Sequence, residues 1–219
     1  MDGPEARKQG QSTTAARSAP RRRDRPLHTT RPISGAGWTR AEAACYVTDA
    51  AGSQDPYWKP TGRLVRIDRD TAEGIVLAGD LPAPNAIAFT AAYDGLGVSH
   101  NTGNQIDYLS LSADGRKVQT AHPAVHVSAG VGQVDSLAVD AAGNTYVGLH
   151  NRATVLVYRP DGELTATIAA PGKDGVSSAT NIAIRPGTTE GYMTVSGKDG
   201  GFIYGFTALA DGVRQSNGG

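Results

Sequence analysis

Short apolar runs separated by Gly, Pro, Asn and Asp follow one another from about Ala43 to the C-terminus. Runs of this kind are typical of β-strands joined by tight turns. Three segments, beginning at Asn85, Asp135 and Thr180, share one order: a polar residue, a short apolar strand, a turn, a second strand, another turn and a third strand. The repetition predicts an all-β protein built from similar units.

The spacing of the units identifies the architecture. The polar residues that open them are taken as Asn85, Asp135 and Asn181, which are 50 and 46 residues apart. Four-stranded units at roughly 40–50 residues are the signature of a β-propeller. The dipeptides Asp114-Gly115 and Asp161-Gly162 are hairpin signals that add a fourth strand to the first two segments.

An earlier unit is visible as predicted strands at 45–48, 63–67 and 74–77, without a first strand. The chain therefore holds about three and a half blades of a propeller, whereas propellers close with roughly four to eight. Either the chain is a fragment of a longer product, which we favour, or an open propeller closes by association with another copy. Pro123, between His122 and His126, predicts a loop.

The first 35 residues differ from the rest in composition and charge. They carry eight basic and three acidic side chains and almost no apolar ones, which predicts a disordered basic head at 1–35 ahead of a partial propeller at 36–219. The remaining residues carry 13 basic and 18 acidic side chains. An acidic body repels nucleic acid and suits a cation.

Composition also bears on disulfides and zinc sites, on membrane spans and on export. Cys45 is the only cysteine, so neither an internal disulfide nor a cysteine-based zinc site is expected. No run approaches the roughly 18 apolar residues of a membrane span. The first residues contain no apolar stretch of a secretory signal, so a cytoplasmic location is the default expectation.

Three stretches resemble one known family. LPAPNAIAF, from Leu81 to Phe89, resembles the Pro-Asn-Gly motif of the gluconolactonase and senescence marker protein (regucalcin) family. The stretch from Val134 to Pro171 is similar to the blade of that family that opens with Asp-Gly and contains Pro-Asp-Gly-Glu, and SSATNIAIRP resembles the strand that follows. The resemblance covers Tyr46 to Phe206.

The resemblance implies a six-bladed propeller that holds one divalent cation, usually Ca²⁺, and hydrolyses lactones or related esters. The family's ligands are a Glu from the first blade and Asn, Asn and Asp from later blades; the last two fall on Asn85 and Asp135. The family's Glu has no counterpart here, the first Asn is replaced by GAGWTRAEAA, and Ala86 and Ser136 stand where the family has Gly.

The repeat alone also suggests a metal site. Residues that open the innermost strands of successive blades converge at one end of a propeller's channel, so Asn85, Asp135 and Asn181 are candidate metal ligands. Asn and Asp offer oxygen, which suits a hard cation such as Ca²⁺. Ca²⁺ takes about six to eight oxygens, so water, substrate or absent blades would supply the others. The plainer alternative is that these are turn residues bonded to their own backbone.

Two histidines also stand at similar places in the repeat. His100 and His150 each follow the second strand of a unit. They could line the channel mouth and transfer protons, or form hydrogen bonds between blades.

Two functions follow from these observations. The first is a metal-dependent hydrolase of a small-molecule lactone or ester, with Asp135 as ligand and candidate general base, or an inactive form that lacks the first-blade ligands. The second is a non-catalytic propeller that presents one face to a small ligand or protein partner.

Overall fold

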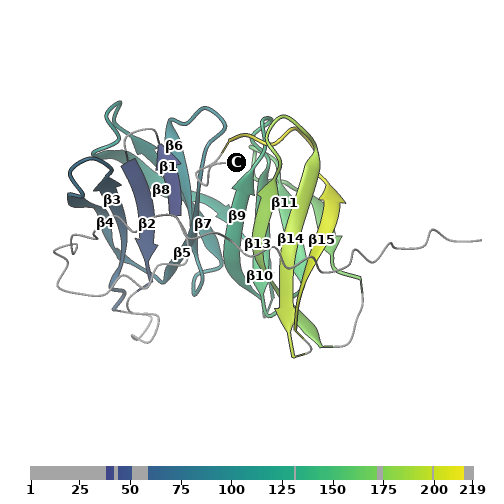
Figure 1. Ribbon diagram of the computed structural model, residues 1–219. Helices are drawn as coiled ribbons and strands as arrows, with labels where there is room; N and C mark the ends of the chain where they lie inside the picture. Colours follow the sequence, from purple (N-terminus) through teal and green to yellow (C-terminus); the bar gives the residue numbers. More distant parts are fainter. Residues whose placement is uncertain are drawn as a thin grey trace, which may run out of the picture.

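The computed structural model describes residues 38–41, 44–50, 59–130, 132–171, 175–198 and 200–214. These residues form four antiparallel sheets and no helix, so none of them belongs to a helix that could cross a membrane. Within each sheet the strands follow chain order, which is the meander of a propeller blade (Figure 1). The predicted all-β fold is confirmed, and the predicted head lies outside the described residues.

We number the sheets as blades I to IV. Blade I contains β1 (Trp38–Ala41), β2 (Ala44–Asp49), β3 (Gly62–Asp68) and β4 (Gly74–Leu81), and blade II contains β5 (Pro84–Phe89), β6 (Gly95–His100), β7 (Gln105–Leu111) and β8 (Val118–His126). Blade III contains β9 (Gln133–Val139), β10 (Thr145–His150), β11 (Thr154–Tyr158) and β12 (Leu164–Ala169). Blade IV contains β13 (Val176–Ile184), β14 (Glu190–Gly197) and β15 (Gly200–Thr207).

Two details of the sequence-based assignment were wrong. Blade I does have a first strand, because β1 pairs antiparallel with β2 from Trp38↔Val47 to Ala41↔Ala44. The expected loop around Pro123 is part of β8, where Pro123 lies opposite Asp107 next to a register shift. Proline is tolerated there because β8 is an outer strand of its sheet, and an edge strand does not need every amide as a donor.

The blades pack face to face, which explains why many strand residues are buried on both sides. Tyr46 of blade I and Phe89 of blade II meet edge to face with ring centroids 5.4 Å apart. All five residues of β11 are buried, because blade III has a neighbour on each face. Three apolar clusters lie between consecutive blades and form the core.

The innermost strands β5, β9 and β13 each contain a β-bulge, which lies near the beginning of β5 and β9 and in the middle of β13. The pairing of β5 with β6 breaks between Pro84 and Ile87, that of β9 with β10 breaks between Val134 and Leu137, and that of β13 with β14 breaks at Thr180. A bulge turns a side chain away from the regular alternation of the strand. The bulges therefore mark the places where these strands present polar residues.

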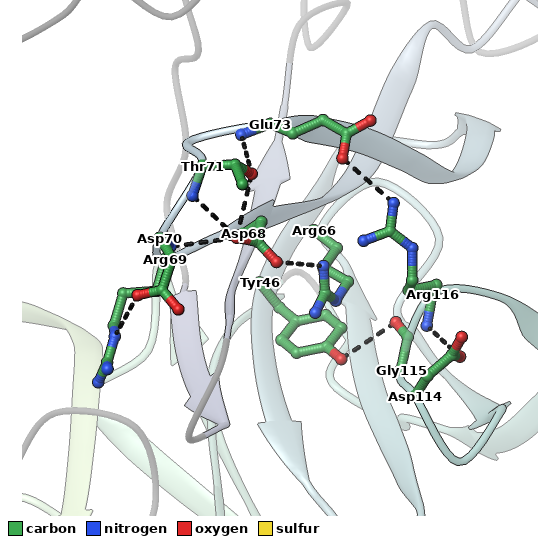
Figure 2. Close-up of polar contacts among 10 residues, drawn as sticks. All are labelled: Tyr46, Arg66, Asp68, Arg69, Asp70, Thr71, Glu73, Asp114, Gly115 and Arg116. Atoms are coloured by element: carbon green, nitrogen blue, oxygen red, sulfur yellow. Dashed lines mark hydrogen bonds and ion pairs between the residues drawn. The ribbon is translucent and has the colours of Figure 1, made fainter.

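Blades I and II are also joined by polar contacts of the β7–β8 turn with strand β2 and with the β3–β4 turn, shown in Figure 2. The Tyr46 hydroxyl donates to the carbonyl oxygen of Gly115 at 3.1 Å, and Glu73 forms an ion pair of 3.2 Å with Arg116. Gly115 has a φ of 66°, and a Cβ there would lie 2.1 Å from the Tyr46 hydroxyl. This turn therefore needs glycine both for its conformation and for the close approach of Tyr46.

After β15 the chain returns across blades IV, III and II. The amide of Leu209 donates to the Tyr146 hydroxyl at 2.7 Å, the amide of Ala141 donates to the carbonyl of Asp211 at 2.7 Å, and the Tyr93 hydroxyl donates to the carbonyl of Arg214. Ala141 and Tyr93 follow the ends of β9 and β5. This C-terminal strap, residues 208–214, thus lies at the opposite end of the inner strands from the bulges.

Candidate metal site at the inner-strand bulges

Asn85 and Asp135 occupy the same place in consecutive blades. Each is the first of two residues in the bulge of its inner strand, opposite a single residue of the next strand. The bulge interrupts the alternation of side chains at this point, and bulges are frequent beside functional sites. The local backbone therefore turns both polar side chains toward a common region.

The two predicted ligands meet directly. The Asn85 Nδ2 donates to Asp135 Oδ1 at 3.0 Å, although the residues are 50 positions apart in the sequence. The Asn85 Oδ1 is buried and has no hydrogen-bond partner within the described structure. A buried acceptor without a donor is unfavourable unless a ligand or water satisfies it. Asn85 thus offers a buried amide oxygen next to the Nδ2 group that contacts the carboxylate of Asp135.

The electrostatic environment of Asp135 is set by its burial. Burial raises the pKa of the Asp135 carboxyl above its ordinary value, and the charge of His150 and the hydrogen bond from Asn85 oppose this rise. His150 Nδ1 lies 3.9 Å from Asp135 Oδ2, and its side chain is about half exposed. Asp135 is therefore a partly buried carboxylate that accepts a hydrogen bond from Asn85 on one oxygen and lies near His150 with the other.

The backbone that carries Asp135 is held by the β6–β7 turn of blade II. The Asn101 Nδ2 donates to the carbonyl of Val134 at 3.1 Å, and the Asn104 Nδ2 donates to the carbonyl of Gly132 at 3.1 Å. The Asn104 Oδ1 also accepts from the amide of Val134 at 3.2 Å. Two asparagines of one blade thus fix the residues that precede Asp135 in the next.

The third predicted ligand, Asn181, has a different environment. Its side chain is exposed, and its Oδ1 accepts from the amide of Ile182 at 2.9 Å. The pairing of β13 with β14 places Thr180, rather than Asn181, at the bulge position that corresponds to Asn85 and Asp135. The structure therefore brings together the first two predicted ligands and gives Asn181 a backbone partner of its own.

The two histidines of the repeat are not equivalent. His100 lies opposite Pro84, directly before Asn85, whereas His150 lies opposite Gln133, two residues before Asp135. A shift of one residue sends a strand side chain to the other face. His100 is accordingly fully buried, with Nε2 3.0 Å from Asp107 Oδ2, whereas His150 faces Asp135.

The fold is that of a β-propeller whose inner strands carry the contacting pair Asn85 and Asp135. Residues 37–196 match the family model described as the SMP-30/Gluconolactonase/LRE-like region. The chain belongs to this family. A search of curated proteins finds no match.

Several solved structures share the fold. A luciferin-regenerating enzyme is 16% identical, with 81% of this chain and 62% of that chain covered and a TM-score of 0.66. A calcium-binding protein, regucalcin, from Agrobacterium tumefaciens is 15% identical, with 78% and 61% covered and a TM-score of 0.62. A gluconolactonase from Xanthomonas campestris is 20% identical, with 81% and 59% covered and a TM-score of 0.64. The chain spans about three fifths of the length of each.

The donor chemistry at the bulges fits a hard cation in part. The ligand atoms that Asn85 and Asp135 can offer are oxygens, as Ca²⁺ prefers, and the Asn85 Oδ1 has no hydrogen-bond donor within the described structure. Among the described residues, no three His, Cys, Asp or Glu side chains gather closely enough to hold a metal ion. Two protein side chains are fewer than the six to eight oxygens that Ca²⁺ takes, roughly, so the described residues form part of a coordination shell.

Proposed function

We propose that this chain carries part of the metal centre of a gluconolactonase-like hydrolase, which opens a lactone or a related cyclic ester with water. The observation that carries the proposal is the contact between Asn85 and Asp135, whose side chains meet at 3.0 Å from two consecutive blades. Membership of the gluconolactonase family supports the reaction class. The proposed cation is Ca²⁺, because both side chains offer hard oxygen ligands.

Each residue has a defined task in this proposal. Asn85 contributes its Oδ1, which the fold leaves without a donor, and its Nδ2 holds Asp135 Oδ1 in place. Asp135 contributes one carboxylate oxygen as a ligand, and its Oδ2 accepts the proton of the attacking water. When bound, a divalent cation supplies positive charge that polarises the substrate carbonyl. Asn181 is left out of the proposed set because its Oδ1 is bonded to its own strand.

Burial of Asp135 supports its use as a base. A carboxylate whose pKa is raised by burial takes up a proton more readily than an exposed one. Coordination of a cation acts in the opposite direction. The proposal therefore assigns ligation and proton acceptance to different oxygens of Asp135, with His150 on the Oδ2 side.

A lactone panel tests the function. Wild type and Asp135→Ala are assayed for ring opening with Ca²⁺ and with a chelator, and Asp70→Ala, a change at an exposed carboxylate, is the control. We expect wild type and the control to turn over at least one lactone in a Ca²⁺-dependent manner. Asp135→Ala is expected to lose about 10²–10⁴-fold in kcat, as for removal of a general base.

The outcome that contradicts the proposal is equally defined. If wild type opens no lactone of the panel with or without Ca²⁺, the hydrolase is excluded for this chain. The non-catalytic propeller that presents a face to a ligand or partner then becomes the better account.

A further inference from the structure

A single buried hydroxyl connects the two candidate ligands through their backbones. Ser99 lies on β6 opposite the bulge of β5, and its side chain is fully buried. Its Oγ accepts from the amide of Ala86 at 2.8 Å and donates to the carbonyl of Asp135 at 2.9 Å; the carbonyl of Ala86 lies 3.3 Å away. Ala86 directly follows Asn85, so the hydroxyl joins the Asn85 bulge of blade II to the Asp135 bulge of blade III.

This connection controls the spacing of the site. Asn85 and Asp135 come from separate sheets, and packing of apolar faces alone tolerates small sliding of one sheet over the other. A hydrogen bond of 2.9 Å to the Asp135 main chain restricts such sliding at the point where the carboxylate leaves the backbone. Metal sites are sensitive to this restriction because ligand residues must be held to within about 0.5 Å.

The same arrangement occurs one blade earlier. Thr48 of β2 is fully buried, and its Oγ1 donates to the carbonyl of Asn85. In blade III the residue opposite the bulge of β9 is Gly148, which has no hydroxyl. A Cβ there would lie 2.5 Å from the carbonyl of Ala179, which precedes Thr180. At this position of the second strand, a hydroxyl is thus present in blades I and II, which precede Asn85 and Asp135, and absent in blade III, which precedes Thr180.

We propose that Ser99 is a positioning residue for the metal site, which it serves by fixing the backbone of Asp135 against the Asn85 bulge, and that Thr48 fixes Asn85 in the same way. This inference rests on the proposed function of the Asn85 and Asp135 pair. Ser99 acts through the main chain and does not contact the cation. Its loss changes the relative position of the two ligand side chains while both remain present.

Calcium titration of the full chain by calorimetry tests the role of Ser99. The variant is Ser99→Ala, and the matched control is Ser178→Ala, which removes another buried hydroxyl between blades. Ser178 Oγ accepts from the amide of Asn151 at 3.1 Å, and within the described structure it has no hydrogen bond to the backbone of Asn85 or Asp135. We expect Ser99→Ala to weaken the Ca²⁺ affinity about ten-fold and Ser178→Ala to change it less than about two-fold.

A conservative variant separates the hydroxyl from general packing. Ser99→Thr retains the hydroxyl, as Thr48 does in blade I, and is expected to bind Ca²⁺ within about three-fold of wild type. When wild type binds Ca²⁺, the proposal is overturned if Ser99→Ala and Ser178→Ala bind it equally well, or if Ser99→Thr is as weak as Ser99→Ala.

A measurement without metal distinguishes failure of this inference from failure of the proposed function. In the metal-free protein, the Asn85 Nδ2 protons report the hydrogen bond to Asp135 by NMR. We expect Ser99→Ala to shift these resonances and to speed their exchange with water, while Ser178→Ala leaves them unchanged. If wild type binds no Ca²⁺ but this contrast holds, the metal site fails and the positioning role stands; if the contrast is missing, the positioning role fails.

Discussion

Two aspartates near opposite ends of strand β9, the fully buried Asp140 and the partly buried Asp135, differ in how far the protein's own donors satisfy their carboxylates. Asp140 is fully buried, and its Oδ1 accepts from the amides of Ala142 and Asn144 at 3.0 and 2.9 Å. Its Oδ2 accepts from Asn144 Nδ2 at 2.8 Å and from the Tyr146 hydroxyl at 3.0 Å. Asp135 accepts from Asn85 on Oδ1, while its Oδ2 faces His150 beyond hydrogen-bond distance.

The contrast teaches how the fold uses the two ends of its inner strands. At the Asp140 end, donors surround the carboxylate and the C-terminal strap packs over it, so the charge is compensated by the protein itself. At the Asp135 end, loss of solvation on burial raises the pKa of the carboxyl, and the charge of His150 and the hydrogen bond from Asn85 only partly oppose this rise. A bound cation can therefore stabilise the charge of Asp135, whereas the charge of Asp140 is already stabilised by hydrogen bonds within the protein.

The largest expected effect is the loss of Asp140. Asp140→Ala leaves the Tyr146 hydroxyl, the Asn144 side-chain amide and two backbone amides without their acceptor, and should lower the free energy of unfolding by about 3–4 kcal/mol. Urea denaturation measures this loss. Asp140→Asn retains one acceptor oxygen and should lose less. A loss below 1 kcal/mol for Asp140→Ala would contradict the structural role.

A matched pair of glycine substitutions comes next. In Gly148→Ala the new methyl would lie 2.2 Å from Ser136 Oγ, beside Asp135, and in Gly212→Ala it would lie 2.6 Å from the carbonyl of Ile184, beneath the strap. Both overpack a buried position and should destabilise the fold by about 2–3 kcal/mol. Only Gly148→Ala should also weaken Ca²⁺ binding, by about ten-fold or more, because it displaces the Asp135 bulge. Equal Ca²⁺ affinity of the two variants would show that the bulge geometry does not matter.

The sequence predicted the parts of this contrast that depend on local pattern. Tight turns at Asp114-Gly115 and Asp161-Gly162, and strands at the repeat spacing, follow from residue types in short windows, and the structure has β7–β8 and β11–β12 hairpins there. The pairing of Asn85 with Asp135 was also predictable, because both open equivalent strands of consecutive blades.

Register was the part that sequence could not determine. Whether Thr180 or Asn181 occupies the bulge, and whether His100 or His150 faces the site, depends on the position of one extra residue in a strand pair. Both faces of a blade are apolar, so the pattern of apolar residues looks nearly the same in two registers that differ by one residue. The buried Ser99 in an apolar strand was the available signal for the missed hydroxyl.

A smaller effect is expected at alkaline pH from Tyr146. Burial raises the pKa of the Tyr146 hydroxyl from 10.0 to about 12. The folded state therefore holds this proton more tightly than the unfolded state does. The resulting contribution of Tyr146 to the free energy of unfolding, up to about 2 kcal/mol, is complete below pH 10 and is lost as the pH rises toward about 12.

Tyr146→Phe isolates this contribution from that of other tyrosines. The variant should lose about 1 kcal/mol at pH 7, because one donor to Asp140 is removed. The advantage of wild type over Tyr146→Phe in unfolding free energy, measured by urea denaturation from pH 8 to 11.5, should fall as the pH rises and reverse sign near the upper end. A constant difference would show that Tyr146 does not titrate in this range.

The smallest effect on the metal-free fold, and the one with the opposite sign, is expected for Asp135→Asn. Because burial raises the pKa of Asp135 in the folded state, its ionisation opposes folding as the pH rises through the folded pKa. An uncharged Asn still accepts from Asn85, so the variant should be as stable as wild type or up to about 1 kcal/mol more stable at pH 7, with no gain at low pH. With Ca²⁺ at about 100 times its dissociation constant, wild type should gain roughly 2.7 kcal/mol and the variant nothing. If metal-free Asp135→Asn lost as much stability as Asp140→Asn, both carboxylates would be needed for folding. The proposed ligand role of Asp135 requires the opposite, because a carboxylate that serves to bind a cation should not stabilise the metal-free fold.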